Sequence, residues 1–461
     1  MQTNRELRNI QQKVVRKQAQ NSTAHQFFNI LTGHQLLCAI ETLLPEHRER
    51  RFPPTETLSL FLSQSMSADR SCQNVVNEMA VQRIACGLPV SNPNTGSYCK
   101  ARSRLPTSMV STLTRYTGSL MDNEVPVQWR WQGRSVRLID GTTVTLPDTP
   151  ENQAIYPQQR SQKSGLGFPI CRIVGVICLA SGGILNAAIG PFSGKGASEQ
   201  TLLRRMLDTF EAGDVVLGDG FYASYFLLAA LLDRGVDSVF EQLGARKIVT
   251  DFRTGKKLGS SDHLISYEKP PKKPGWMSEE QYLAAPDTLI VREVKVGGKI
   301  LVTTLLSPSD ASKRALKDLY KSRWNVELDL RNIKTTLGME TLSCKTPEMI
   351  EKEMWVYFLA YNLIRIMMAE AASWSNLLPR QLSFKHTLQL WRAWRQRSYK
   401  LDEECLQVLL MLIVGNTVGN RPGRIEPRAV KRRPKPYPLL MKKRDEARVE
   451  IKKYGHPKKQ K

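Results

Sequence analysis

The sequence predicts an α/β fold in which a mixed β-sheet lies between two helical regions. Apolar residues recur at helical spacing through the first 125 residues and again from about Ser309 onward. Between these regions, from Trp129, there are segments in which apolar and polar residues alternate with period two, as in strands, and short apolar helical segments lie between them. Strands and helices in this order are typical of α/β proteins with a mixed sheet.

The N-terminal region, residues 1–125, is expected to be helical and polar. A turn-rich stretch at 91–97 introduces a short basic helix, YCKARSRLP, which ends at Pro106. This helix admits two interpretations: it presents Lys and Arg side chains to a DNA groove, or it is a connecting helix with a solvated basic face. The apolar helical segments before it are Phe27–Leu43, Leu58–Met66 and Val75–Ile84.

The central region carries the strand signals. The segment SVRLIDGTTVTL is predicted to be a strand that leads into a turn at Asp140. The segment DVVLGDGFY is predicted to be a short buried strand with Asp219 at its C-terminal end. A hairpin is expected around the turn Ser181-Gly182-Gly183. Ser198 is expected to cap the helix that follows this hairpin.

A β-rich insertion is predicted between the second aspartate and the later helices. The segment TLIVREVKVGGKILVTTLL holds two alternating runs separated by Gly297-Gly298, which is a hairpin signal. The predicted parts of the chain are a helical N-terminal region (1–125), a first core segment (126–244), the β-rich insertion (245–308), a second core segment (309–375), C-terminal helices (376–420) and a basic tail (421–461).

The charge of the chain indicates a polyanionic partner. Its 67 Lys and Arg residues exceed its 43 Asp and Glu residues, which gives a formal net charge of +24. DNA or RNA is the first expectation, and an anionic membrane is the alternative. No membrane-spanning segment is expected, because apolar runs such as Val408–Val414 and Phe226–Leu232 are far shorter than the roughly 20 residues that a spanning helix needs. The eight cysteines form no CxxC pair, so no structural zinc site is expected.

Two aspartates are candidates for metal-dependent phosphoryl transfer. Such chemistry on DNA uses carboxylates to hold two divalent cations a few ångströms apart. Asp140 and Asp219 each follow an apolar strand and each precede a glycine. For either residue alone a simple turn role is the better interpretation, because Asp-Gly is common in turns. Two such residues in one core favour a site.

A third acidic residue lies on a helix with a distinctive stripe. In YKSRWNVELDLRNIK, a spacing of about 100° per residue puts Tyr320, Arg323, Glu327 and Lys334 within an arc of roughly 60°. Arg331 lies near the edge of this arc. On the same helix Asp329 points nearly opposite, and is therefore a poor ligand candidate. The alternative is a solvated face with an Arg323–Glu327 pair at i,i+4.

The spacing Tyr-x2-Arg-x3-Glu-x6-Lys resembles the signature of DDE transposases of the insertion-sequence-4 family of bacterial mobile elements. The DGTT and GDGFY segments, with Asp140 and Asp219, resemble that family's two aspartate motifs. The resemblance covers about residues 95–375. It implies a ribonuclease-H-like catalytic core in which Asp140, Asp219 and Glu327 hold two Mg²⁺ or Mn²⁺ ions.

The same resemblance implies roles for five further residues and the partners of the protein. Tyr320, Arg323 and Lys334 would bind DNA phosphates near the cleaved end, joined by Arg331. Trp276, in the insertion, would stabilise a flipped base during hairpin formation, or would be a core residue of the insertion. The partners would be double-stranded DNA, as transposon ends and as target, and a second copy of the chain. The protein would act in the bacterial cytoplasm at the nucleoid.

The expected activity is cleavage at the terminal inverted repeats of an insertion sequence, followed by strand transfer. Two alternatives stay open. One is a catalytically inactive or domesticated relative that binds DNA, against which the presence of all three carboxylates argues. The other is a structure-selective nuclease with the same core, which would cut without joining.

Overall fold

The computed structural model describes residues 42–43, 52–85, 87, 92–194, 196–244, 250–397, 403–419 and 442–454. Its strands are β1 Val136–Thr145, β2 Ile170–Cys178, β3 Ile184–Pro191, β4 Val215–Gly218, β5 Asp237–Glu241, β6 Lys256–Gly259, β7 Asp262–Glu268, β8 Thr288–Val296 and β9 Lys299–Thr303. Its longer helices are α4 Pro54–Met66, α5 Cys72–Ala85, α6 Gly96–Arg104, α7 Thr107–Asn123, α10 Tyr225–Asp233, α13 Lys313–Ser322, α14 Trp324–Arg331, α15 Pro347–Ser373, α16 Phe384–Arg397, α17 Glu403–Val414 and α18 Arg444–Tyr454; the short ones are α8 Pro150–Ile155, α9 Glu199–Arg204 and α12 Glu279–Ala284.

All nine described strands join one mixed sheet, in the order β3-β2-β1-β4-β5-β9-β8-β7-β6. Strands β1, β2 and β3 form an antiparallel meander, while β4 and β5 add to β1 in parallel. This five-strand arrangement is that of a ribonuclease-H-like core. The predicted fold class, with helices on both sides of the core in the sequence, is therefore confirmed.

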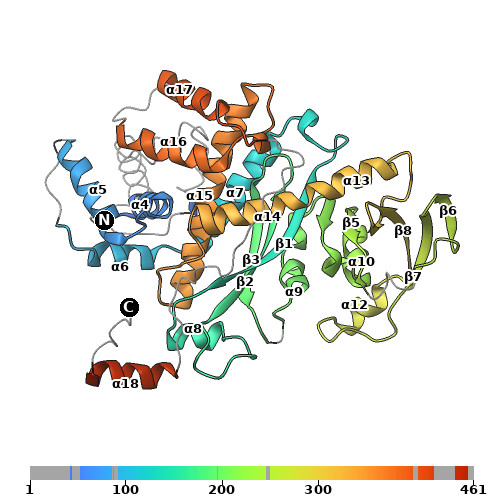
Figure 1. Ribbon diagram of the computed structural model, residues 1–461, viewed down its shortest axis with the longest axis horizontal. Helices are drawn as coiled ribbons and strands as arrows, with labels where there is room; N and C mark the ends of the chain where they lie inside the picture. Colours follow the sequence, from blue (N-terminus) through green and yellow to red (C-terminus); the bar gives the residue numbers. More distant parts are fainter. Residues whose placement is uncertain are drawn as a thin grey trace, which may run out of the picture.

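The core sheet is covered by helices on both faces (Figure 1). Alternate residues of β1 face opposite ways, as expected for a strand. Leu138 packs into the larger apolar cluster with α7 and α15, whereas Ile139 packs into a second cluster with α9 and α10. Because β1 is buried on both faces, it is held firmly, and α14 packs against it from the side of the larger cluster.

The insertion continues the core sheet. Strand β9 pairs antiparallel with β5, so β9, β8, β7 and β6 extend the sheet away from β1, at the end opposite α4 to α6 in Figure 1. The predicted hairpin is present: Val296 pairs with Lys299, and the Gly297-Gly298 turn between them has positive φ at both residues, a conformation that glycine adopts without strain.

The N-terminal helices form their own small core. Tyr98 of α6 is fully buried against α4 and α5, and the Arg102 guanidinium lies 4.8 Å from the centroid of the Phe61 ring. Arg102 is thus a packing residue, while Lys100 and Arg104 of the same helix are exposed. Most of the predicted helix Phe27–Leu43 lies outside the described residues.

The C-terminal helices α16 and α17 pack on α15, the long central helix. Part of the region predicted as a tail is helical. Helix α18 follows Lys442–Lys443, and its first residue, Arg444, forms an ion pair with Asp148 and donates to the Gly167 carbonyl at 2.7 Å. Within the part of the chain that the structure describes, no helix is both long and apolar enough to cross a membrane.

Candidate active site

Asp140 and Asp219 lie side by side on neighbouring parallel strands. The register of β1 and β4 runs from Val136 opposite Val215 to Leu138 opposite Leu217. Asp140 and Asp219 each follow by two residues, so they occupy equivalent positions where the two strands separate. Adjacent strands are about 4.8 Å apart, which brings the two carboxylates within reach of one cation or of a pair.

The strand bearing Asp140 is longer than predicted. Strand β1 continues to Thr145 through its pairing with β2, so Asp140 is opposite Gly175 in mid-strand and does not lead into a turn. The prediction was wrong because an Asp-Gly pair in the sequence does not reveal that a neighbouring strand continues the ladder. Asp219 does end its strand, and its side chain accepts a hydrogen bond at 2.9 Å from the Phe221 amide.

The surroundings of the Asp140 carboxyl group disfavour its ionised form. Burial raises its pKa to about 6, and the nearby negative charges of Asp219 and Glu199 act in the same direction. A hydrogen bond from the Gly141 amide at 2.8 Å and the charge of Arg323 oppose this shift. A bound cation reduces the repulsion between carboxylates that lie this close together.

Glu199 is a further carboxylate at this site that the sequence did not reveal. It is the first residue of α9, which Ser198 caps as predicted. A Cβ placed on Gly141 would lie 2.2 Å from the Glu199 Cδ, so the carboxylate rests against the backbone of β1 only because residue 141 is glycine. The Tyr222 hydroxyl donates to Glu199 Oε2 at 3.2 Å. An acid in the first turn of a helix is common, and nothing in its local sequence marks it.

Helix α14 delivers Glu327 to the same place. The predicted single helix is divided at Arg323, between α13 and α14, although Arg323 keeps helical dihedral angles. Its guanidinium joins two of the carboxylates: Nη2 lies 3.0 Å from Glu327 Oε1, and Nη1 lies 4.0 Å from Asp140 Oδ2. Asp140, Arg323 and Glu327 therefore form one charged cluster, which the solvated-face interpretation of this helix does not explain.

The other two signature residues flank this cluster. The Tyr320 hydroxyl donates to Glu241 Oε2 at 3.3 Å, and burial together with Glu241 raises the pKa of Tyr320. The Lys334 ammonium donates to Thr142 Oγ1 at 3.2 Å, and burial lowers its pKa. Lys334 lies in a π-helical segment, Asn332–Thr336, where the 100° spacing assumed from the sequence no longer holds.

The family is established by comparison with known proteins. Residues 131–363 match the family model described as "Transposase DDE domain". The chain belongs to this transposase family. It is 28% identical over 435 residues to the transposase InsG for insertion sequence element IS4 of Escherichia coli K12, with 88% of this chain and 91% of the relative covered. It is 31% identical over 137 residues to the putative transposase InsZ of the same organism, covering 30% of this chain and 45% of that one.

A solved structure also resembles this transposase. It is the piggyBac transposase synaptic complex with hairpin DNA, with a TM-score of 0.43 and 10% identity, covering 87% of this chain and 86% of that one.

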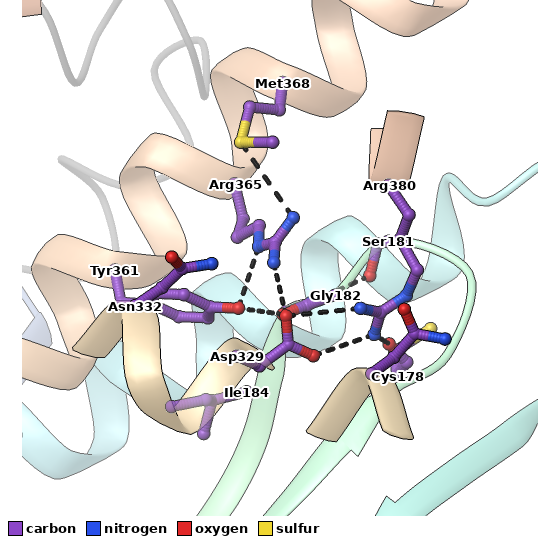
Figure 2. A network of polar contacts seen from close by, with 12 residues as sticks. Cys178, Ser181, Gly182, Ile184, Asp329, Asn332, Tyr361, Arg365, Met368 and Arg380 are labelled. Carbon is purple, nitrogen blue, oxygen red and sulfur yellow. Dashed lines mark hydrogen bonds and ion pairs between the residues drawn. The ribbon is translucent and has the colours of Figure 1, made fainter. Parts of the chain in front are cut away.

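The fixed orientation of α14 in the transposase comes from the face opposite Glu327. Asp329 is completely buried and forms ion pairs with Arg365 of α15 and with Arg380, which follows α15 (Figure 2). Arg380 also donates to the Cys178 carbonyl at 3.1 Å, so the network reaches the β2–β3 hairpin. Asp329 thus points away from the cluster around Glu327, as its place on the helix predicted.

Two predicted DNA-contacting residues lie away from the carboxylates. Arg331 is exposed, and its side chain lines a large cleft together with Asp329. Trp276 is 46% exposed; the Arg204 guanidinium lies 3.7 Å from its ring centroid, and the Phe226 ring meets it edge-on at 6.3 Å. Trp276 therefore docks the insertion onto α9 and α10, and it also keeps an exposed part.

The donor set suits a hard divalent cation. Carboxylate oxygens are the ligands that Mg²⁺ and Mn²⁺ prefer. Among the described residues, no three acidic, histidine or cysteine side chains already converge on one metal position. The Arg323 guanidinium lies between Asp140 and Glu327 and is ion-paired with Glu327.

Proposed function

We propose that this transposase cleaves DNA at the terminal inverted repeats of a bacterial insertion sequence and joins the released 3′ end to target DNA. One observation carries the proposal above all: Asp140 and Asp219 occupy equivalent positions on adjacent parallel strands, and Arg323 links Asp140 to Glu327. The match to the DDE transposase family supports it.

In this proposal Asp140, Asp219 and Glu327 hold two Mg²⁺ or Mn²⁺ ions, which supply activation of the attacking oxygen and stabilisation of the leaving oxygen. The raised pKa of Asp140 supports its role as a metal ligand. The pKa is raised because the ionised carboxylate is poorly stabilised by its surroundings, and a nearby cation would stabilise it. Glu327 has 35% of its side chain exposed, and in this proposal it turns from Arg323 toward the aspartates when metal binds.

Tyr320, Arg323 and Lys334 bind the phosphates of the cleaved strand. All three lie around the carboxylates, and each carries a hydrogen-bond donor that a phosphate oxygen accepts. When Arg323 engages a phosphate, its pairing with Glu327 and Asp140 weakens. DNA binding and release of the carboxylates are thereby coupled through one guanidinium.

The rest of the chain supports this reaction. We assign 1–125 to recognition of the terminal repeats, 126–244 and 309–375 to catalysis, and 245–308 to the insertion. The C-terminal helices, 376–420, and the basic segment 421–461 add DNA affinity and contacts between two copies, and the protein acts on nucleoid DNA in the bacterial cytoplasm. A sedimentation measurement that finds one chain per paired-end complex would refute the dimer.

We further propose that the cleaved ends pass through a DNA hairpin intermediate. The exposed part of Trp276 would contact a base displaced from the hairpin. Replacing Trp276 by Ala should reduce hairpin ends among the products while nicking continues. An unchanged yield of hairpin ends would remove Trp276 from this role.

The test of the proposed function is Mg²⁺-dependent cleavage of duplex DNA that contains the element ends. Glu327→Gln should abolish cleavage and leave DNA binding nearly unchanged, whereas the matched variant Asp318→Asn, an exposed acid on α13, should cleave normally. Cleavage by Glu327→Gln at the wild-type rate would contradict the proposal. With a pre-cleaved end, joined product identifies a transposase, and cutting without joining identifies a nuclease.

A further inference from the structure

A large basic cleft lies on the face of α14 opposite Glu327. Its volume is about 1250 Å³, and α14, the π-helical segment after it, α16 and the segments around Arg380 and Val418 form its walls. Its lining in the described part of the chain holds five cations and one acid: Arg331, Arg365, Arg380, Lys385, Arg392 and Asp329. The cleft is separate from the carboxylate cluster, because Asp140, Asp219, Arg323 and Glu327 are all absent from its lining. Asp329 projects about 200° around the helix from Glu327, and Arg331, about 40° from Glu327, forms the edge of the cleft on that side.

The charged groups on the floor of this cleft already have partners within the fold. Asp329 is paired with Arg365 and Arg380, and Arg365 is further held by the Tyr361 hydroxyl, to which its Nε donates at 2.8 Å (Figure 2). Arg392 donates to the Ser67 carbonyl at 3.3 Å, which holds α16 beside α4. These bonds make the floor and one wall rigid.

Two cationic side chains on the rim of the cleft are available to bind a ligand. Arg331 and Lys385 are exposed, and neither makes an ion pair or a hydrogen bond with any residue that the structure describes. Between them the lining offers uncharged hydrogen-bonding side chains: Asn325, Asn332, Thr335, Gln381, Ser383 and Gln389. Arginine, lysine, amides and hydroxyls are the groups that bind phosphate and sugar in DNA complexes.

We propose that this cleft binds the phosphodiester backbone of a DNA duplex independently of sequence, at a site separate from the cleaved phosphate. The inference rests on the proposed function for its class of ligand. Its one aromatic lining residue, Phe384, is buried, so among the described residues the cleft offers no exposed ring on which a base could stack. The proposal assigns Arg331 to this cleft, because its side chain is part of the lining.

The test is a salt titration of duplex binding by the full chain, followed by fluorescence anisotropy. The variant Arg331→Gln/Lys385→Gln should bind roughly tenfold more weakly near physiological salt, and the slope of log affinity against log salt should become shallower by about 1–2. Lys256→Gln/Lys257→Gln removes the same charge from exposed positions on β6 and should leave the slope near the wild-type value. An unchanged slope in the cleft variant, or an equal change in the control, would overturn the proposal.

Two further arms separate this inference from the proposed function. The loss should be equal for a duplex that contains the element end and for an unrelated duplex; a loss confined to the element end would refute sequence-independent binding. At saturating DNA the cleft variant should retain Mg²⁺-dependent cleavage. Glu327→Gln should keep the wild-type salt slope while losing cleavage, so each idea can fail without the other.

Discussion

Arg323 Nη2 lies 3.0 Å from Glu327 Oε1, one helical turn along the same helix. The contact has the form of an ordinary i,i+4 ion pair. Arg323 also has a second carboxylate partner, because its Nη1 lies 4.0 Å from Asp140 Oδ2 on the central strand. A fixed positive charge therefore stands between two carboxylates to which we assign a shared metal.

Arg323→Gln should raise the affinity of the DNA-free protein for Mn²⁺ several-fold. Removal of the guanidinium leaves Asp140 and Glu327 with uncompensated negative charge that a metal ion can neutralise. The measurement is an electron paramagnetic resonance titration of free Mn²⁺. Arg331→Gln removes the same charge from an exposed position that forms no ion pair with a described carboxylate, so it is the matched control and should change little. An affinity equal to or below the control value would show that Arg323 does not compete with metal.

The sequence predicted some features of the core and of the site but not others. It placed Asp140 and Asp219 with strands and Glu327 on a helix, because strand alternation and helical spacing are local patterns. It missed the continuation of β1 past Asp140, since that depends on pairing with β2. It also missed Glu199, which reaches the site only through the absence of a side chain at Gly141. Arg331 was placed at the edge of the signature arc from its helical spacing, and its long side chain lines the rim of the cleft, which helical spacing alone does not reveal.

Asp140→Asn should stabilise the metal-free protein at neutral pH. Because the folded-state pKa of about 6 exceeds the ordinary value of 3.8, the folded protein holds this proton more tightly than the unfolded chain does. The ionised carboxyl therefore costs stability, by about 1–3 kcal/mol at pH 7, and the cost disappears as pH falls from about 6 toward 4.

The check is the free energy of unfolding in urea, with a chelator, at pH 7 and pH 4.5. The difference between Asp140→Asn and wild type should be largest at pH 7 and should shrink at pH 4.5. An equal difference at both pH values, or a less stable variant at pH 7, would contradict the assigned environment of Asp140.

Gly141→Ala should destabilise the protein by about 1–3 kcal/mol, because the added Cβ would overlap the Glu199 carboxylate. The backbone at Gly141 is ordinary strand, so conformational strain does not contribute. In the double variant Gly141→Ala/Glu199→Ala the loss should be smaller than the sum of the two single losses. Additive losses in thermal unfolding would show that the two residues are not in contact.

Asp329→Asn should lower the free energy of unfolding by about 3–5 kcal/mol. It removes the charge that compensates Arg365 and Arg380 in a buried network, which leaves those cations without their partner. Asp318→Asn, at an exposed ion pair with Lys321, should cost less than about 1 kcal/mol. Similar losses for the two variants in urea unfolding would mean that the buried network does not anchor α14.

The most direct test of the shared metal site is the number of Mn²⁺ ions bound in the complex with cleaved end DNA, counted by electron paramagnetic resonance. The wild-type protein should bind two ions per active site. Asp140→Asn, Asp219→Asn and Glu327→Gln should each lose at least one of them, and Asp318→Asn should lose neither. Retention of both ions by any one of the three carboxylate variants would show that its residue is not a ligand, and would contradict the account.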